Sequence, residues 1–226
     1  MKATDPSALL SRVDHLVYAV PDLDRGIAYI EQLLRIRATL GGRHAGRGTH
    51  NALLALGPRT YLEIIGPDPA QTNAPKPFWF GVDRLVAPAL VTWAAHTSDL
   101  EGVAEKAARD GVTLGDIIAG SRRRTDGVEL RWRYTDPLRL IADGLVPFFI
   151  DWADAEHPAQ SAAQGAALIG LRAEHPEPER VQEMLRSLDL AISVRPAQHP
   201  ALIATIDCAR GASSYGNLRP CTRDPL

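Results

Sequence analysis

The sequence lacks several features that mark whole classes of proteins. Its 226 residues include 2 cysteines, Cys208 and Cys221, which are too few for a disulfide framework and lie outside the spacing of a metal knuckle. There are 25 basic and 27 acidic residues and no long block of lysine or arginine, so the charge pattern of a nucleic-acid-binding protein is missing. We therefore expect reduced thiols and no nucleic-acid partner.

Long apolar runs are also missing. No stretch approaches the roughly 20 apolar residues that cross a bilayer, and the first residues lack the charged and then apolar pattern of a secretion signal. The motifs of serine hydrolases, phosphate-binding loops and dinucleotide-binding loops do not occur either. The sequence predicts no membrane partner and a cytoplasmic location, and it gives no sign of nucleophilic hydrolysis or nucleotide chemistry.

A pattern of an apolar run followed by an amphipathic helix occurs three times along the chain. The helices are expected to begin near Asp22, Ser98 and Glu177, about 76 to 79 residues apart, which indicates duplication of one unit. In the first two copies, further extended runs follow the helix and give the order βαβββ.

These patterns predict an α+β protein built from repeated modules. Residues 10–70 form the first βαβββ module, residues 86–153 the second, and residues 165–215 an abbreviated third module of βαβ type. Segments rich in Pro, Ala and Gln separate the modules, as is typical of connecting segments.

The stretch GTHNALLALGPRTYLEIIGP consists of two apolar runs separated by a Pro-containing turn, with His50 in the first run and Glu63 in the second. An unpaired buried charge costs several kcal/mol, so each residue needs either a metal ion or a hydrogen-bond partner. His15 stands in a third apolar strand, HLVYAV. Because side chains alternate along strands, the three residues meet only if the three strand faces on which they lie coincide, and alternation alone does not decide this.

These motifs carry a resemblance to a known family. The segments DHLVYAVPDLDRGIAYIEQLL, GGRHAGRGTHNALLALG, YLEIIGPDP and VPFFIDW resemble the glyoxalase-like branch of the vicinal oxygen chelate superfamily, over nearly the whole chain. The resemblance implies that the modules pair into a cup-shaped mixed sheet, within one chain or between two chains. Since this chain has two complete modules, pairing within the chain is the simpler expectation, and it predicts a monomer or a homodimer.

The resemblance also implies a divalent metal in the hollow of the sheet. His15 matches the first-strand ligand of the superfamily and Glu63 the fourth-strand ligand, whereas the second module has Thr92 and residues 147–149 at the equivalent positions. His50 would then complete a site of two histidines and one carboxylate, which suits Zn, Fe, Mn or Ni. On this hypothesis Glu63 and His50 are also the catalytic groups. The alternative is that each residue merely finds a hydrogen bond.

Arginine and aromatic residues alternate in the segment SRRRTDGVELRWRY. If the arginine face lines the hollow, Arg131 and Arg133 would bind a carboxylate or phosphate; if the aromatic face does, Trp132 would stack on a ligand. An outward arginine face paired with acidic neighbours is the remaining alternative. We predict as substrate-binding residues Arg131, Trp132, Arg133 and Phe148, and we expect Arg122 to Arg124 to form a solvated loop.

Two functions are consistent with these expectations. The first is a lyase, isomerase or dioxygenase that acts on a small oxygen-rich molecule in the hollow with the help of a metal. The second, similar to the antibiotic-sequestering proteins of the bleomycin-resistance type, is metal-free binding of a small molecule. The matches at His15 and Glu63 favour the enzyme, and the missing ligands of the second module favour binding.

Overall fold

The computed structural model describes residues 10–124, 127–208 and 216–218. The first unit contains β1 (Val13–Ala19), α2 (Leu23–Leu34), β2 (Thr39–His44), β3 (Thr49–Gly57) and β4 (Thr60–Pro67). The second contains β5 (Ala89–His96), α3 (Leu100–Arg109), β6 (Ile117–Arg124), β7 (Glu129–Thr135) and β8 (Phe148–Asp151). The third contains β9 (Ala166–His175), α4 (Pro178–Ser187), β10 (Ser193–Pro196), β11 (Ala201–Cys208) and β12 (Gly216–Leu218). Three 3-10 turns, η1 (Trp79–Gly81), η2 (Ile141–Gly144) and η3 (Pro158–Gln160), lie in the connections.

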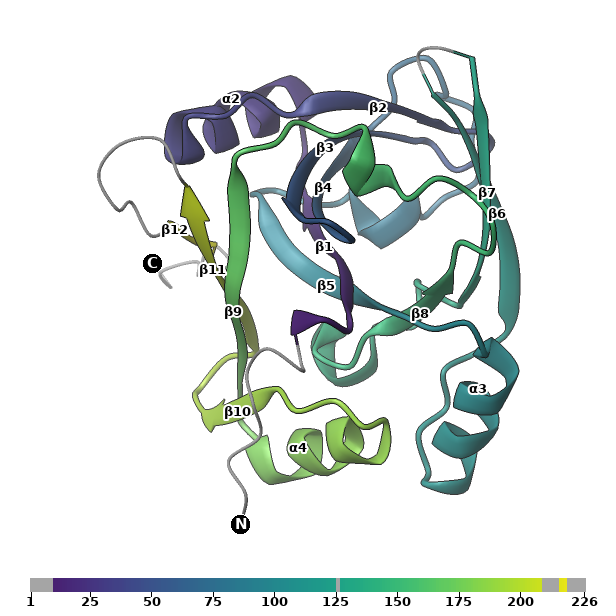
Figure 1. Cartoon of the computed structure of the whole chain (residues 1–226), viewed down its shortest axis with the longest axis vertical. Helices are drawn as coiled ribbons and strands as arrows, with labels where there is room; N and C mark the ends of the chain where they lie inside the picture. Colours follow the sequence, from purple (N-terminus) through teal and green to yellow (C-terminus); the bar gives the residue numbers. More distant parts are fainter. Residues whose placement is uncertain (1–9, 125–126, 209–215, 219–226) are drawn as a thin grey trace.

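The first two units form one mixed sheet in the order β1-β4-β3-β2-β6-β7-β8-β5. In each unit the first and last strands pair in parallel, as β1 does with β4 and β5 with β8. The sheet curls until β1 pairs antiparallel with β5, and it thereby closes into a barrel (Figure 1). The predicted α+β fold of paired βαβββ modules with a curved mixed sheet is confirmed.

The third unit forms a separate sheet beside the barrel (Figure 1). Its strands β9 and β10 are parallel and are joined by α4, which is the predicted βαβ arrangement. Strand β11 pairs antiparallel with β9, and β12 pairs antiparallel with β11. We propose the predicted ranges 10–70, 86–153 and 165–215 as the repeat units; residues 209–215 lie outside the described part of the chain.

Two of the helices, α2 and α3, begin at a capping side chain. Asp22 accepts a hydrogen bond from the backbone N–H of Arg25 at 3.0 Å and caps α2. The second cap is Asp99, one residue later than predicted, which accepts from the backbone N–H of Gly102 at 2.9 Å. Among the described helices, none has the length and apolarity needed to cross a membrane.

Alternation along the barrel strands separates two apolar cores. Outward residues such as Leu54 of β3 and Ile64 of β4 pack with α2 and with the third unit. Inward residues such as Leu53 and Ile65 fill part of the barrel together with aromatic rings from the connections. The inward faces of β1, β3 and β4 also carry the polar groups of the candidate site.

Candidate functional site

A cavity opens inside the barrel, between the polar inward face of the first unit and the aromatic inward face of the second. Its empty volume of about 410 Å³ includes open solvent at its mouth, and the enclosed part is narrow, about 30 Å³. Its lining consists of His15, His44, Asn51, Tyr61, Glu63, Trp79, Phe80, Arg122, Trp132, Tyr134, Pro137, Phe148, Ile150 and Trp152. A concave site with aromatic walls and a few converging polar groups is typical of small-molecule binding.

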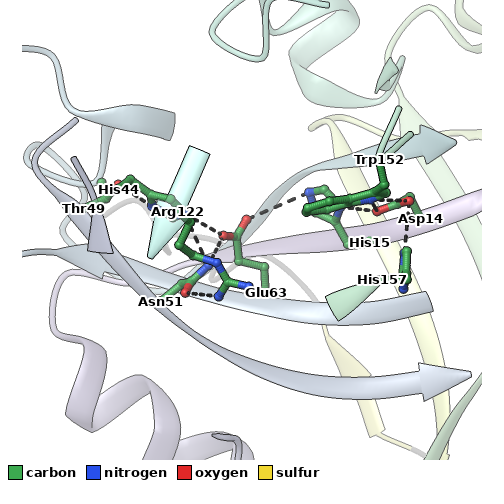
Figure 2. Close-up of polar contacts among 9 residues, drawn as sticks. All are labelled: Asp14, His15, His44, Thr49, Asn51, Glu63, Arg122, Trp152 and His157. Atoms are coloured by element: carbon green, nitrogen blue, oxygen red, sulfur yellow. Dashed lines mark hydrogen bonds and ion pairs between the residues drawn. The ribbon is translucent and has the colours of Figure 1, made fainter. Parts of the chain in front are cut away.

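A β-bulge in β1 brings Asp14 and His15 together. The register between β1 and β5 shifts by one residue between Val13 and His15, so that neighbouring side chains no longer point to opposite faces. The Nδ1 atom of His15 lies 2.7 Å from Oδ1 of Asp14, and both side chains are buried (Figure 2). A carboxylate at Nδ1 holds the imidazole with its Nε2 atom directed elsewhere.

Two further donors hold the Asp14 carboxylate in place. Oδ2 of Asp14 accepts a hydrogen bond from the indole Nε1 of Trp152 at 3.0 Å and lies 3.2 Å from Nε2 of His157. Because Nδ1 of His157 accepts from the backbone N–H of Ala159 at 3.2 Å, its proton is on Nε2, facing Asp14. Burial alone would raise the pKa of Asp14, but hydrogen bonds and charge interactions with His15 and His157 outweigh it and lower the pKa to about 2.

A second chain of hydrogen bonds ends at Glu63. Nη1 of Arg122 donates to Oδ1 of Asn51 at 3.0 Å, and Nδ2 of Asn51 donates to Oε1 of Glu63 at 2.6 Å (Figure 2). The guanidinium can only donate, so it fixes the orientation of the Asn51 amide and directs the amide nitrogen at Glu63. We call Arg122, Asn51 and Glu63 the polar relay. A methyl group at Gly41 would lie 2.2 Å from both Nη1 of Arg122 and Oδ1 of Asn51, so this position needs glycine.

His44 lies at the other end of the polar relay, buried in the barrel. Its Nε2 atom is 3.7 Å from Oε1 of Glu63, and its Nδ1 atom is 2.9 Å from Oγ1 of Thr49. Burial, followed by the positive charge of Arg122, lowers the pKa of His44 to about 3. The imidazole is therefore neutral at physiological pH.

The two chains of hydrogen bonds meet across a gap. Nε2 of His15 and Oε2 of Glu63 face each other at 3.9 Å, which is too long for a direct hydrogen bond (Figure 2). The His15 ring stacks on Tyr61 with 4.7 Å between ring centroids, and it contacts the edge of Phe148. Burial raises the pKa of Tyr61 well above its ordinary value, so its hydroxyl keeps its proton.

The predicted substrate-binding residues divide between the two faces of the second unit. Trp132 and Phe148 line the cavity, as the hypothesis of an inward aromatic face expects. Arg131 and Arg133 point outward and pair with Glu129 and Glu101, with more than one third of each side chain exposed. Their predicted role in the hollow is not supported, because side chains in β7 alternate and the aromatic face is the inward one.

Two other expectations need correction. Asn51 points inward to Glu63, so His50, its neighbour in β3, lies on the opposite face and does not join His15 and Glu63. Arg122, expected in a solvated loop, is buried in β6 with 4% of its surface exposed. The side chain of Arg124 and residues 125–126 lie outside the described part of the chain.

The donors present do not fit the divalent metal that the resemblance implies. The nitrogens of His15 and His44 approach different oxygens of Glu63, at 3.9 and 3.7 Å, and the two rings lie on opposite sides of this carboxylate and do not converge on one point (Figure 2). One of these oxygens already accepts from Asn51, and the Arg122 cation lies beside the same group. Within the described ranges no three His, Cys, Asp or Glu side chains are grouped to hold a metal.

Several site residues were not predicted from the sequence. Asp14 stands next to His15 and Asn51 next to His50, two histidines that were predicted as site residues. The only sequence signal for Asp14 and Asn51 themselves was that a polar residue occupies a position in an apolar strand. His157 carried no signal, because it lies in a connection and reaches Asp14 only through the closed fold.

Comparison with known proteins identifies a family. Residues 13–188 match the model of the glyoxalase-like domain. The chain is similar to the solved structure of a hypothetical protein from Staphylococcus aureus, with 16% sequence identity and a TM-score of 0.62 over 92% of this chain and 87% of the other. A comparison with curated proteins finds no match.

A methylmalonyl-CoA epimerase from Mycobacterium tuberculosis is also similar, with 23% identity and a TM-score of 0.40 over 66% of this chain and 91% of that one. The similarity to the Staphylococcus aureus structure supports a common fold and not a shared reaction. Because the family model covers most of the chain and the paired βαβββ units match it, the chain belongs to the glyoxalase-like domain family of the vicinal oxygen chelate superfamily.

Proposed function

We propose that the protein binds a small organic molecule in the barrel cavity and catalyses a proton transfer on it, with His15 as the base. One observation carries the proposal: Asp14 holds Nδ1 of His15 at 2.7 Å, and this leaves Nε2 directed at the gap in front of Glu63. A base that is oriented by a buried carboxylate is a recurring arrangement in enzymes that move protons.

The chemistry follows from the side chains alone. A proton leaves a carbon next to a carbonyl group of the ligand for Nε2 of His15, and the electrons of the broken C–H bond move to the carbonyl oxygen. Asp14 stabilises the imidazolium that forms, and the positive charge of this imidazolium compensates the negative charge that develops on the ligand. Return of the proton to the opposite face of the same carbon completes an isomerisation by inversion. In a lyase reaction the electrons return from the oxygen and expel a leaving group, with its bonding electrons, from the carbon on the other side. Because the donors do not fit a metal, no step of this scheme uses one.

Solvent deuterium incorporation tests this proposal. Small ketones and aldehydes with a hydrogen next to the carbonyl are incubated in D₂O with the wild type, with His15→Asn and with Arg131→Gln, an outer-face control. We expect the wild type and the control to catalyse incorporation for at least one compound and His15→Asn to be slower by about 100-fold or more. Equal rates for His15→Asn and wild type, including no catalysis by either, would contradict the proposal.

The second candidate function is binding without chemistry, and the aromatic walls favour it. Trp79, Trp132, Trp152 and Phe148 line the same cavity and can hold a flat ligand by stacking alone. A ligand that binds in the cavity but takes up no deuterium would support this function over proton transfer.

A further inference from the structure

The proposed site leaves one polar position open to a ligand. His15 and Glu63 face the gap, and each has one polar atom in a hydrogen bond. Nδ1 of His15 is bonded to Asp14, and Oε1 of Glu63 accepts from Asn51. The atoms left to meet a ligand are Nε2 of His15 and Oε2 of Glu63, 3.9 Å apart. A carboxylate oxygen can only accept a hydrogen bond, so the part of the ligand at Oε2 has to be a donor.

The charges around the cavity select an uncharged ligand. The carboxylate of Glu63 and the guanidinium of Arg122 both line the cavity and are linked through Asn51, so their charges offset each other. A charged ligand would bring an uncompensated charge into a largely buried aromatic space, which is costly. A cation would also be repelled by Arg47, whose guanidinium lies 5.3 Å from the centre of the Trp79 ring in the cavity wall.

The walls of the cavity select a flat molecule. The ring centroids of Trp79 and Tyr134 are 5.9 Å apart in an edge-to-face contact, and the ring centroids of Trp132 and Trp152 are 5.1 Å apart. Tightly grouped rings leave narrow spaces, which a planar conjugated molecule fills with the largest contact area.

Resting on the proposed function, we infer that the ligand is an uncharged, flat, conjugated carbonyl compound that also carries a hydroxyl group, of a phenol or an enol. The hydroxyl donates to Oε2 of Glu63, and the rings of Trp79, Trp132 and Phe148 enclose the conjugated part. The hydroxyl position is thus fixed next to the atom on which His15 acts.

Ligand-observed NMR titrations of para-cresol and its relatives test this ligand class. We expect the wild type to bind para-cresol about tenfold or more tightly than para-methylanisole, its methyl ether, because the ether has no donor for a charged acceptor. The anion para-toluate and the cation para-methylbenzylamine should also bind at least about tenfold more weakly than para-cresol. Equal binding of the ether, or tighter binding of either charged relative, would overturn the inference without any need for a variant.

The polar relay makes Glu63→Gln a sharp second test. Since Arg122 directs the amide nitrogen of Asn51 at position 63, the substituted side chain has to turn its carbonyl oxygen to Asn51 and its NH₂ group to the cavity. The acceptor at the Oε2 position thereby becomes a donor. We expect the preference for para-cresol over para-methylanisole to disappear or reverse in Glu63→Gln and to persist in Arg131→Gln. A folded Glu63→Gln variant that keeps the wild-type preference would contradict the inference.

The proposed reaction and the proposed ligand class can be contradicted independently of each other. If Glu63→Gln removes the preference for para-cresol but His15→Asn has no effect on deuterium incorporation, the ligand class stands and the proposed reaction fails. If deuterium incorporation depends on His15 while para-cresol shows no preference over its ether, the proposed reaction stands and the ligand class fails.

Discussion

Asp14 and Glu63 are both buried carboxylates, but their hydrogen bonds differ. Asp14 has contacts to His15, Trp152 and His157 and is fully enclosed, so it acts on a ligand only through the His15 ring. Glu63 accepts from Asn51 at one oxygen and keeps the other directed at the cavity. On the proposed function, this difference gives Asp14 a positioning role and Glu63 direct contact with the ligand.

The neutral state of His44 predicts a pH dependence of stability. The folded protein takes up a proton on His44 only near pH 3, whereas the unfolded chain does so near 6.5, so the unfolded state is favoured as the pH falls below 6.5. Between pH 7 and pH 5 this residue should lower the free energy of unfolding by about 2 kcal/mol. Urea unfolding at both pH values measures this decrease in the free energy of unfolding. We expect the decrease to be smaller in His44→Gln than in the wild type, by the contribution of His44. The same loss in both proteins would contradict the assignment.

Part of the candidate site could be predicted from the sequence, residue by residue. His15 and Glu63 could be selected because each interrupts an apolar strand, and they do face the same cavity. His50 was selected by the same rule and lies on the other face of β3, because alternation gives the relative side of residues within one strand and not between strands. The bulge that places Asp14 beside His15 has no sequence signal of its own.

At the scale of elements, close approach of strands positions the polar relay. Arg122 of β6 reaches Asn51 of β3 across β2, and it passes over Gly41, where a side chain would collide with both groups. The Gly-Gly pair at 41 and 42 lies within β2, beside a register shift. Helices and most strands were predictable from periodicity, whereas this use of glycine depends on a neighbour from the second unit.

The substitution Gly41→Ala should therefore disrupt the polar relay. Its methyl group would displace Arg122 or Asn51 and break a buried hydrogen bond to a charged group, so we expect the free energy of unfolding to fall by about 1 to 3 kcal/mol. Gly170→Ala, in β9, is the matched control because its nearest neighbour would be Thr205 at an ordinary 3.5 Å. Urea unfolding of both variants checks this, and similar losses in the two would count against the relay.

At the scale of the whole molecule, the third unit shares a core with the barrel. Leu185 of α4 and Leu202 of β11 belong to the same buried apolar cluster as Leu54 of β3 and Trp93 of β5. The backbone N–H of Ala55 also donates to the carbonyl of Ala163, in the connection that leads to the third unit. Sequence periodicity predicted this unit but could not show what its apolar face covers.

A shared core predicts coupled unfolding. All 4 tryptophans lie between residues 79 and 152, outside the third unit, so their fluorescence reports on the barrel and, through Trp93, on the core that the barrel shares with that unit. Leu185→Ala should lower stability by about 2 to 5 kcal/mol and shift the fluorescence and circular dichroism transitions to the same lower urea concentration. A fluorescence transition that stays at its wild-type midpoint would show that the third unit unfolds independently.

The central claim, that Asp14 leaves Nε2 of His15 open as a base, is tested most directly by nitrogen-15 NMR of the imidazole side chains. His15→Asn identifies the His15 signals, and spectra are recorded at a pH where the ring is neutral. We predict a proton on Nδ1, facing Asp14, a bare Nε2, and loss of this preference in Asp14→Asn. A proton on Nε2 in the wild type would contradict the account, because that nitrogen could not then accept a proton from a ligand.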